Sequence, residues 1–161
     1  MPEAKPRDSA DVRIFPPAAP LVTVLLGAAL GQIIPIKLDF LLPAPLRYWI
    51  GGIIVLGALL GLGLWSVLLM RTSGQSENPW KPTLQIERRG PFRITRNPMY
   101  LQMVLICIGF AIALANVWIL ILTPFCALVL RRLAINPEEE YLERKFGEEY
   151  LAYKRRVRRW I

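Results

Sequence analysis

The sequence of 161 residues contains no histidine, which excludes imidazole as an acid, a base or a metal ligand. Cysteine is nearly absent as well, since only Cys107 and Cys126 occur, and both fall inside one long apolar run. Cysteines in such a setting are expected to pack in a reduced environment rather than to form a disulfide. The sequence therefore predicts no metal site.

Acidic residues are few, with 12 Asp and Glu against 20 Lys and Arg, which leaves a net charge of +8. A basic balance is one mark of nucleic-acid binding, but no basic face here alternates with exposed aromatic residues. Instead, Lys and Arg gather at the ends of apolar runs, as in the cytoplasmic flanks of membrane helices. We therefore expect no nucleic-acid partner.

Charged residues are absent altogether from three long segments, 14–36, 48–70 and 97–130. A helix needs about 20 apolar residues to cross a hydrocarbon core of about 30 Å, and the first two segments reach that length. The third is too long for one helix at about 1.5 Å per residue, and Asn116 predicts a turn near its middle. The sequence thus predicts an all-α integral membrane protein with about four transmembrane helices, the last two forming a hairpin.

These helices are expected at about 20–36, 48–70, 99–114 and 117–135. In the second, Gly57 and Gly61 have the spacing that lets helix backbones approach closely. This spacing favours packing between the first two helices, and a homodimer contact is the alternative.

Composition divides the chain into three regions. Residues 1–17 are polar and proline-rich, and we expect a poorly ordered tail. Residues 18–70 hold the first two helices and a short connection, and residues 71–161 hold a basic loop, the hairpin and the C-terminal helix. By the positive-inside rule the basic loop is cytoplasmic, and both termini are then expected there too, in the inner membrane of a bacterium or archaeon.

The segment after the hairpin is predicted to be an amphipathic helix at the membrane interface. Asn136 and Pro137 suit a helix start, and the glutamates that follow complement the helix dipole. Apolar and aromatic residues then recur at spacings of three and four, interrupted only by Gly147. The basic run 154–159 is expected to bind anionic lipid headgroups.

Two polar motifs bracket the predicted hairpin. Residues 90–100 read GPFRITRNPMY, and residues 138–153 read EEEYLERKFGEEYLAY. With both motifs in this order, the chain resembles the isoprenylcysteine carboxyl methyltransferase family, which is related to the phospholipid methyltransferases. The resemblance covers about residues 82–161, and the first two helices carry no sign of it.

The resemblance implies a membrane-embedded methyltransferase that uses S-adenosylmethionine and takes a lipid-like acceptor from the bilayer. It assigns cofactor binding to residues of the hairpin and the C-terminal helix: Arg96, Asn97, Pro98, Tyr100, Glu138, Glu139, Leu142, Phe146 and Tyr150. The glutamates would engage the ammonium of the cofactor, an arginine its carboxylate, and the apolar and aromatic residues its adenine. Arg132 and Glu139 are the predicted catalytic residues, with Arg132 holding the acceptor.

Two positions depart from the pattern of that family. Asn97 stands where many members have histidine, and Gln102 stands where glycine is frequent, so that Gln102 would narrow or polarise the pocket. A carboxylate acceptor, the main expectation, needs no base at pH 7, and catalysis then rests on orientation and desolvation. A phospholipid amine, the alternative acceptor, must lose a proton, to which a glutamate would contribute.

Other interpretations stay open. The three glutamates can be simple helix capping, Arg131 and Arg132 can be cytoplasmic anchors, and Asn97-Pro98 can serve only to direct the chain into the third helix. The whole chain can also be an NADPH-dependent enzyme like the sterol reductases, or a non-catalytic membrane scaffold. Stabilisation by S-adenosyl compounds, by NADPH or by neither would separate these classes.

Overall fold

The computed structural model describes residues 8–36 and 42–161. Residues 1–7 of the predicted tail and 37–41 of the first connection lie outside the described residues. The α-helices are α1 (Ala18–Ile33), α2 (Ala44–Gly57), α3 (Trp65–Thr72), α4 (Pro98–Ala113), α5 (Val117–Leu130), α6 (Asn136–Phe146) and α7 (Glu148–Arg156). The π-helical stretches η1 (Ala58–Leu64) and η3 (Arg131–Ile135) make α2–α3 and α5–α6 continuous, and η2 (Gly90–Arg93) is a short 3-10 turn.

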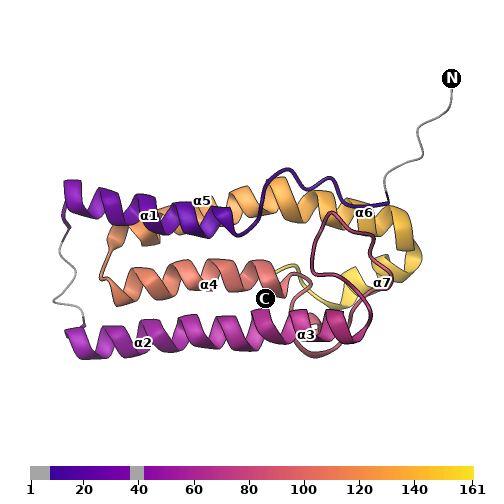
Figure 1. Ribbon diagram of the computed structural model, residues 1–161, viewed down its shortest axis with the longest axis horizontal. Helices are drawn as coiled ribbons and strands as arrows, with labels where there is room; N and C mark the ends of the chain where they lie inside the picture. The colour runs from indigo at the N-terminus through magenta and orange to yellow at the C-terminus, as the bar shows by residue number, and fades with distance from the viewer. Residues whose placement is uncertain (1–7, 37–41) are drawn as a thin grey trace, which may run out of the picture.

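The long helices form a bundle in which α4 lies between α2 and α5, and α1 packs on α5 (Figure 1). The α4–α5 hairpin is confirmed. Its turn is set by Ala115, with φ 47°, and by Asn116, whose Oδ1 accepts a hydrogen bond from the Ile119 N–H at 3.0 Å. The N-terminal segment, the loop 73–97 and α6–α7 all gather at the opposite end of the bundle from this turn (Figure 1).

The contact predicted for Gly57 and Gly61 is wrong, because a Cβ at either position would meet nothing within 4 Å. The second helix packs on α4 instead of α1, and there Gly51 lies against the backbone of Gly109. Glycine at that crossing lets the two helices approach closely. A homodimer stays a prediction.

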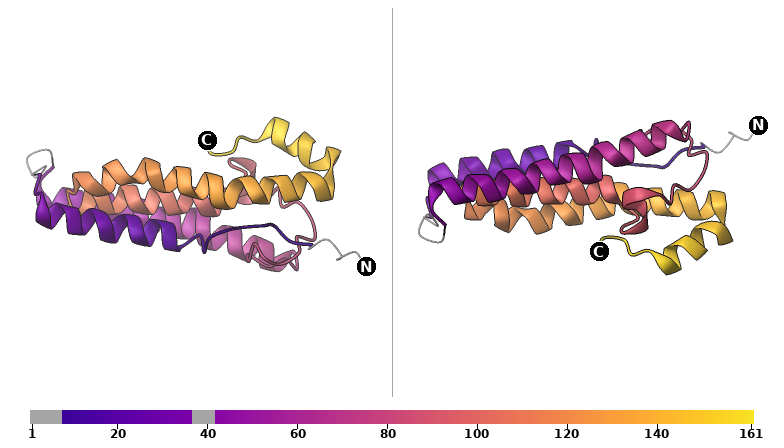
Figure 2. Two further views of the ribbon diagram at one scale, coloured as in Figure 1. Left: turned by 90° about the horizontal axis from the view of Figure 1, so that it is seen from above. Right: turned by 90° about the horizontal axis from the view of Figure 1, so that it is seen from below.

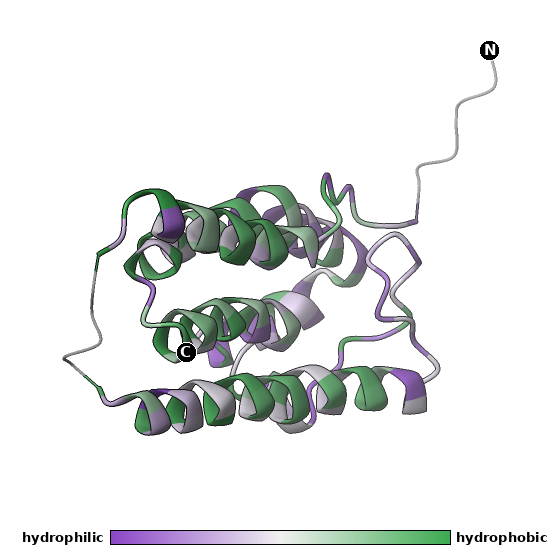
Figure 3. Ribbon diagram, turned by 60° about the vertical axis from the view of Figure 1, so that its left-hand side comes forward, coloured by the Kyte–Doolittle hydropathy of each residue, from purple (hydrophilic) through white to green (hydrophobic). Residues whose placement is uncertain are grey.

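Two helices, Ala44–Thr72 and Val117–Phe146, are long and apolar enough to cross a membrane. Their apolar side chains face outward, and Trp49 and Phe125 are 72% and 61% exposed. Hydrophobic residues run along the length of the helices (Figure 3), and exposed apolar side chains of this kind suit a lipid environment. Helices α1 and α4 are apolar but shorter, with 16 residues each, so that four transmembrane spans stay a prediction.

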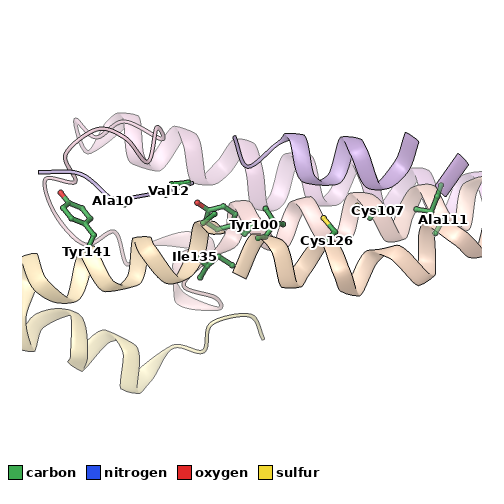
Figure 4. Close-up of a cluster of buried hydrophobic side chains, with 11 residues drawn as sticks. Ala10, Val12, Tyr100, Cys107, Ala111, Cys126, Ile135 and Tyr141 are labelled. Carbon is green, nitrogen blue, oxygen red and sulfur yellow. The ribbon is translucent and has the colours of Figure 1, made fainter. Parts of the chain in front are cut away.

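Residues 8–17 are not the poorly ordered tail that their composition predicts. They form an extended strap along α6 and the end of α5, in which Val12 is buried (Figure 4). The Arg13 N–H donates to the Leu133 carbonyl at 2.9 Å, and Trp80 Nε1 donates to the Val12 carbonyl at 3.0 Å. The strap therefore joins the helices to the loop 73–97, and we refer to residues 8–17 as the N-terminal strap.

The C-terminal region forms two helices instead of one. Gly147 separates α6 from α7 with φ 52° and ψ −128°, a conformation that only glycine adopts without strain. As a result α7 turns back alongside the bundle, and the chain ends against it (Figure 2). The prediction of one C-terminal helix is wrong, because Gly147 divides it and turns α7 back. A position at the membrane interface stays a prediction.

The buried core runs through the bundle to this end of the molecule (Figure 4). Cys107 and Cys126 are both free and buried in it, as predicted for packing residues. Tyr100 and Ile135 continue the core toward the polar end, where the N-terminal strap covers it. The polar motifs of the sequence therefore lie on the rim of a packed core.

Candidate active site

The two polar motifs meet at the strap end of the bundle. The first includes residues 95–97, just before α4, which begins at Pro98, a residue suited to the first helical position. The second begins at Glu138 and Glu139 in the first turn of α6. Helix α7 and the C-terminal segment 157–161 pack beside both, so that the C-terminal end joins the site.

Glu139 is the centre of a buried ionic cluster. Its side chain is 5% exposed and accepts hydrogen bonds from Arg96 Nη2 at 3.1 Å, Arg159 Nη2 at 2.5 Å and Asn97 Nδ2 at 3.3 Å. A buried carboxylate is tolerated when it is paired and hydrogen-bonded in this way. The Glu139 carboxylate is therefore fully engaged by the protein itself.

Arg96 fastens the C-terminal segment to the start of α4. Its Nη1 donates to the carbonyls of Lys154 and Val157, each at 3.0 Å, and its backbone N–H donates to the Arg158 carbonyl at 2.9 Å. Thr95 Oγ1 adds a hydrogen bond to the Arg159 carbonyl at 2.9 Å. These bonds hold Arg159 over Glu139.

Glu138 is in a different state from its neighbour. Its carboxylate accepts one hydrogen bond from the described residues, from the Tyr100 hydroxyl at 2.8 Å, and it is only partly buried. Adjacent residues on an α-helix point about 100° apart, so that Glu138 and Glu139 face different surroundings. The pair thus separates into one saturated carboxylate and one with free acceptor capacity.

A small cavity of about 60 Å³ lies between these groups. Six of the nine residues predicted to bind the cofactor line it: Arg96, Asn97, Glu138, Glu139, Leu142 and Tyr150. Tyr100 does not line the cavity, but its hydroxyl donates a hydrogen bond to Glu138, which does. Pro98 is the first residue of α4. The volume is that of about two water molecules, so that a larger ligand requires the walls to move apart.

Two predicted residues stand apart from this cavity. Arg132 is exposed on η3, and it makes no ion pair with any residue that the structure describes. Phe146, at the end of α6, is partly buried but does not line the cavity. The catalytic role assigned to Arg132 therefore stays a prediction without support from its surroundings.

Other residues enter the site that sequence reasoning missed. Arg159 belongs to the basic run that was expected to bind headgroups. Its neighbour Trp160 packs against the core, and this aromatic residue is the one feature of the run that indicates an inward position. Gln75 lines the cavity, and its Nε2 has no hydrogen-bond partner among the described residues. No local pattern in the loop distinguishes Gln75.

Two tyrosines and Glu87 beside the cavity are fixed in their charge states. Burial raises the pKa of Tyr150 and of Tyr153, whose hydroxyl donates to the Phe92 carbonyl at 2.6 Å, so that both stay neutral. Glu87 accepts hydrogen bonds from Arg89 Nε at 2.9 Å and Ser73 Oγ at 2.6 Å, and the Arg89 contact lowers the pKa of Glu87 to about 2. Glu87 is therefore an anion that holds the loop against the end of α3.

An all-helical protein with outward-facing apolar helices and a polar site at one end fits a membrane-embedded enzyme. The chain belongs to the phospholipid methyltransferase family, whose family model matches residues 46–149, more than half of the chain. That match includes α2, which had shown no sign of the resemblance, and it ends before the C-terminal segment. Membership implies a membrane-embedded methyltransferase, and enzymes of this family use S-adenosylmethionine.

The matching family is the relative of the isoprenylcysteine carboxyl methyltransferases, and no match to the latter is shown. An uncharacterized protein of Haemophilus influenzae is 42% identical over 65 residues, which make up 39% of this chain and all of that protein. No solved structure matches the chain.

Proposed function

We propose that the protein methylates the amine of a phospholipid headgroup, with S-adenosylmethionine as the methyl donor. The observation that carries the choice of acceptor is the division between the two glutamates, because Glu138 alone has free capacity to accept a proton. Membership of the phospholipid methyltransferase family supports the same acceptor. The carboxylate acceptor, the main expectation from the sequence, becomes the competing hypothesis.

The residues around the cavity suit the cofactor chemically. Glu138 offers a carboxylate for an ammonium group, and Leu142 and Tyr150 offer apolar walls for adenine. Arg96 Nε and Gln75 Nε2 are buried donors that lack a hydrogen-bond partner among the described residues, and a carboxylate or hydroxyl of a ligand would satisfy them. When bound, the cofactor supplies an electrophilic methyl group on its sulfonium.

An amine acceptor has to lose a proton in order to become a nucleophile. We assign the proton acceptor to Glu138, because the Glu139 carboxylate is occupied by Arg96, Arg159 and Asn97. Tyr100 orients the Glu138 carboxylate through its hydroxyl. This assignment replaces the catalytic role that the sequence had given to Glu139 with a positioning role.

A carboxylate acceptor would instead need a cation to hold it. Arg96 lines the cavity and Arg159 lies next to it on Glu139, and both already bind the Glu139 carboxylate. Arg132, the cation expected to hold the acceptor, is exposed on η3. The charges around the cavity thus favour a cationic or amine group over an anionic one.

The test is methyl transfer by the purified protein in lipid vesicles, with S-adenosylmethionine carrying a labelled methyl group. Phosphatidylethanolamine is offered beside phosphatidylglycerol, which has no amine, and a prenylcysteine, which has a carboxylate. We expect label on the ethanolamine nitrogen, in a form stable to mild base. Label in a base-labile methyl ester would contradict the amine acceptor.

Glu138→Gln is expected to lower kcat at least about a hundredfold, since general base catalysis contributes about 10²–10⁴ in rate. The matched control is Glu140→Gln, because Glu140 is exposed one position beyond the pair. Arg132→Ala tests the role assigned from the sequence. Equal activity in Glu138→Gln and Glu140→Gln would overturn the assignment of the base.

A further inference from the structure

A second and much larger pocket lies on the other side of Tyr100. Its volume is about 600 Å³, which is within the range of about 300–1,000 Å³ typical of ligand pockets. Its walls come from the N-terminal strap, η1, α4 and the loop that carries Trp80, and they include Phe15, Leu60, Leu64, Met99, Trp80 and Met103. Tyr100 lines this pocket and also donates to Glu138, so that it links the apolar pocket to the polar cavity.

The rim of the apolar pocket faces the surroundings of the protein. Leu60 and Leu64 on η1 are 59% and 49% exposed, and Phe15 on the strap is 63% exposed. These side chains lie on the bundle surface that suits lipid, so that a hydrocarbon chain can enter sideways from the bilayer. The walls offer it methyl, methylene and aromatic groups.

Three polar residues, Glu77, Asn78 and Gln102, interrupt these apolar walls. The first two are bonded at the end of α3 and in the loop, because Glu77 pairs with Arg71 at 2.5 Å and Asn78 Oδ1 accepts a hydrogen bond from the Trp80 N–H at 2.9 Å. Gln102 on α4 lines the pocket, and its carboxamide makes no hydrogen bond with any residue that the structure describes. The carboxamide lies against Gly63, where an added Cβ would collide with Gln102 Oε1. Gly63 belongs to the π-helical stretch η1, and π-helical turns are frequent at functional sites.

Gln102 is partly buried, and where lipid chains replace water around its carboxamide, an amide without a partner is unfavourable. A ligand with a hydrogen-bond acceptor at that depth would remove this penalty. A glycerophospholipid has such an acceptor where each acyl chain begins, in the carbonyl of its ester. A prenyl or alkyl chain has none.

We propose that this pocket binds one acyl chain of the phospholipid acceptor and that Gln102 Nε2 donates a hydrogen bond to the ester carbonyl of that chain. The proposal rests on the proposed function, since it takes the acceptor to be a phospholipid. Bound in this way, the lipid enters through the rim at Leu60 and Leu64 and places its headgroup toward Tyr100 and Glu138. Gln102 then determines specificity for ester-linked lipids.

The test compares two lipids that differ only in the carbonyl, diacyl phosphatidylethanolamine and its dialkyl ether analogue with chains of equal length. Binding to the purified protein is measured without cofactor, by displacement of a fluorescent lipid. We expect wild type to bind the ester lipid about fivefold more tightly, as one neutral hydrogen bond of about 1 kcal/mol predicts. Equal affinity for the two lipids would overturn the proposal.

Gln102→Leu is expected to remove the preference while it retains binding of the ether lipid, which also shows that the variant is folded. Gly63→Ala is expected to weaken the preference, because the new methyl group displaces the carboxamide. The matched control is Gln32→Leu, an exposed glutamine on α1 that does not line the pocket. An ester preference that survives in Gln102→Leu would sink the proposal.

The outcome is distinguishable from failure of the proposed function. A protein that methylates phosphatidylethanolamine but binds ester and ether lipids equally keeps the function and loses the role of Gln102. A protein that prefers ester lipids through Gln102 but transfers no methyl group keeps this lipid site and loses the proposed reaction.

Discussion

Replacement of Arg159 by alanine probes the ionic cluster that the structure places around Glu139. The Glu139 side chain is 5% exposed and Arg96 is 7% exposed, whereas Arg159 is 25% exposed. Removal of one partner from a fully buried ion pair costs about 3–5 kcal/mol. Here Arg96 and Asn97 still contact the carboxylate, and solvent reaches part of Arg159, so we expect a loss of about 1–3 kcal/mol.

The assay is thermal unfolding in detergent, followed by tryptophan fluorescence. For a chain of this size each kcal/mol shifts Tm by about 2–4 °C, so that a loss of 2 kcal/mol lowers Tm by about 4–8 °C. The control is Arg155→Ala, since Arg155 lies 3.7 Å from Glu148 and both side chains are mostly exposed. That pair is worth well below 1 kcal/mol.

The reasoning is refuted if Arg159→Ala unfolds at the same temperature as Arg155→Ala. A double-mutant cycle with Glu139→Gln then isolates the pairwise energy, which we expect to be about 1 kcal/mol or more between Arg159 and Glu139. Additive effects of the two substitutions would show that Arg159 is not coupled to Glu139 and would contradict the ionic cluster.

Two further predictions concern the elements that frame the site. The pKa of Glu87 is lowered from 4.5 to about 2 in the folded protein. The Glu87 carboxylate therefore stabilises the fold fully above pH 4.5, and this contribution is lost as the pH falls through 2. The lowered pKa corresponds to at most about 3 kcal/mol of folding free energy, and because Arg89 is exposed we expect about half of that. Acid unfolding of Glu87→Gln should lack this pH-dependent contribution. Identical acid unfolding profiles of the variant and the wild type would contradict the role of Glu87. Gly147→Ala should destabilise the protein by about 1–3 kcal/mol through backbone strain alone, because a Cβ at this position meets nothing within 4 Å. Denaturant unfolding measures the loss. An unchanged unfolding midpoint would contradict the break between α6 and α7.

The helices could be predicted from the sequence because their signals are local. The uncharged run 97–130 exceeds the length of one helix, and Asn116 supplies the turn chemistry that divides it. The N-terminal strap could not be predicted in the same way. Its order comes from hydrogen bonds to Leu133 and Trp80, which are remote in the sequence and leave no trace in its composition.

The site could be predicted in part for a related reason. Arg96 and Glu139 stand in motifs whose types and order indicate a shared pocket, and the structure places them 3.1 Å apart. Arg159 escaped notice because it reaches Glu139 only after Gly147 turns α7 back onto the bundle. In a run of basic residues, no local property separates the one that folds inward from those that stay at the surface.

Tyr100 connects the apolar pocket with the polar cavity. Its ring belongs to the wall of the apolar pocket, while its hydroxyl donates to Glu138 at the polar cavity. A lipid held by its chain on one side of Tyr100 would therefore present its headgroup to the carboxylate on the other. Tyr100→Phe would keep the wall and remove the donor, so that lipid binding should persist while the orientation of Glu138 is lost. The substitution thus separates binding of the chain from reaction at the headgroup within one side chain.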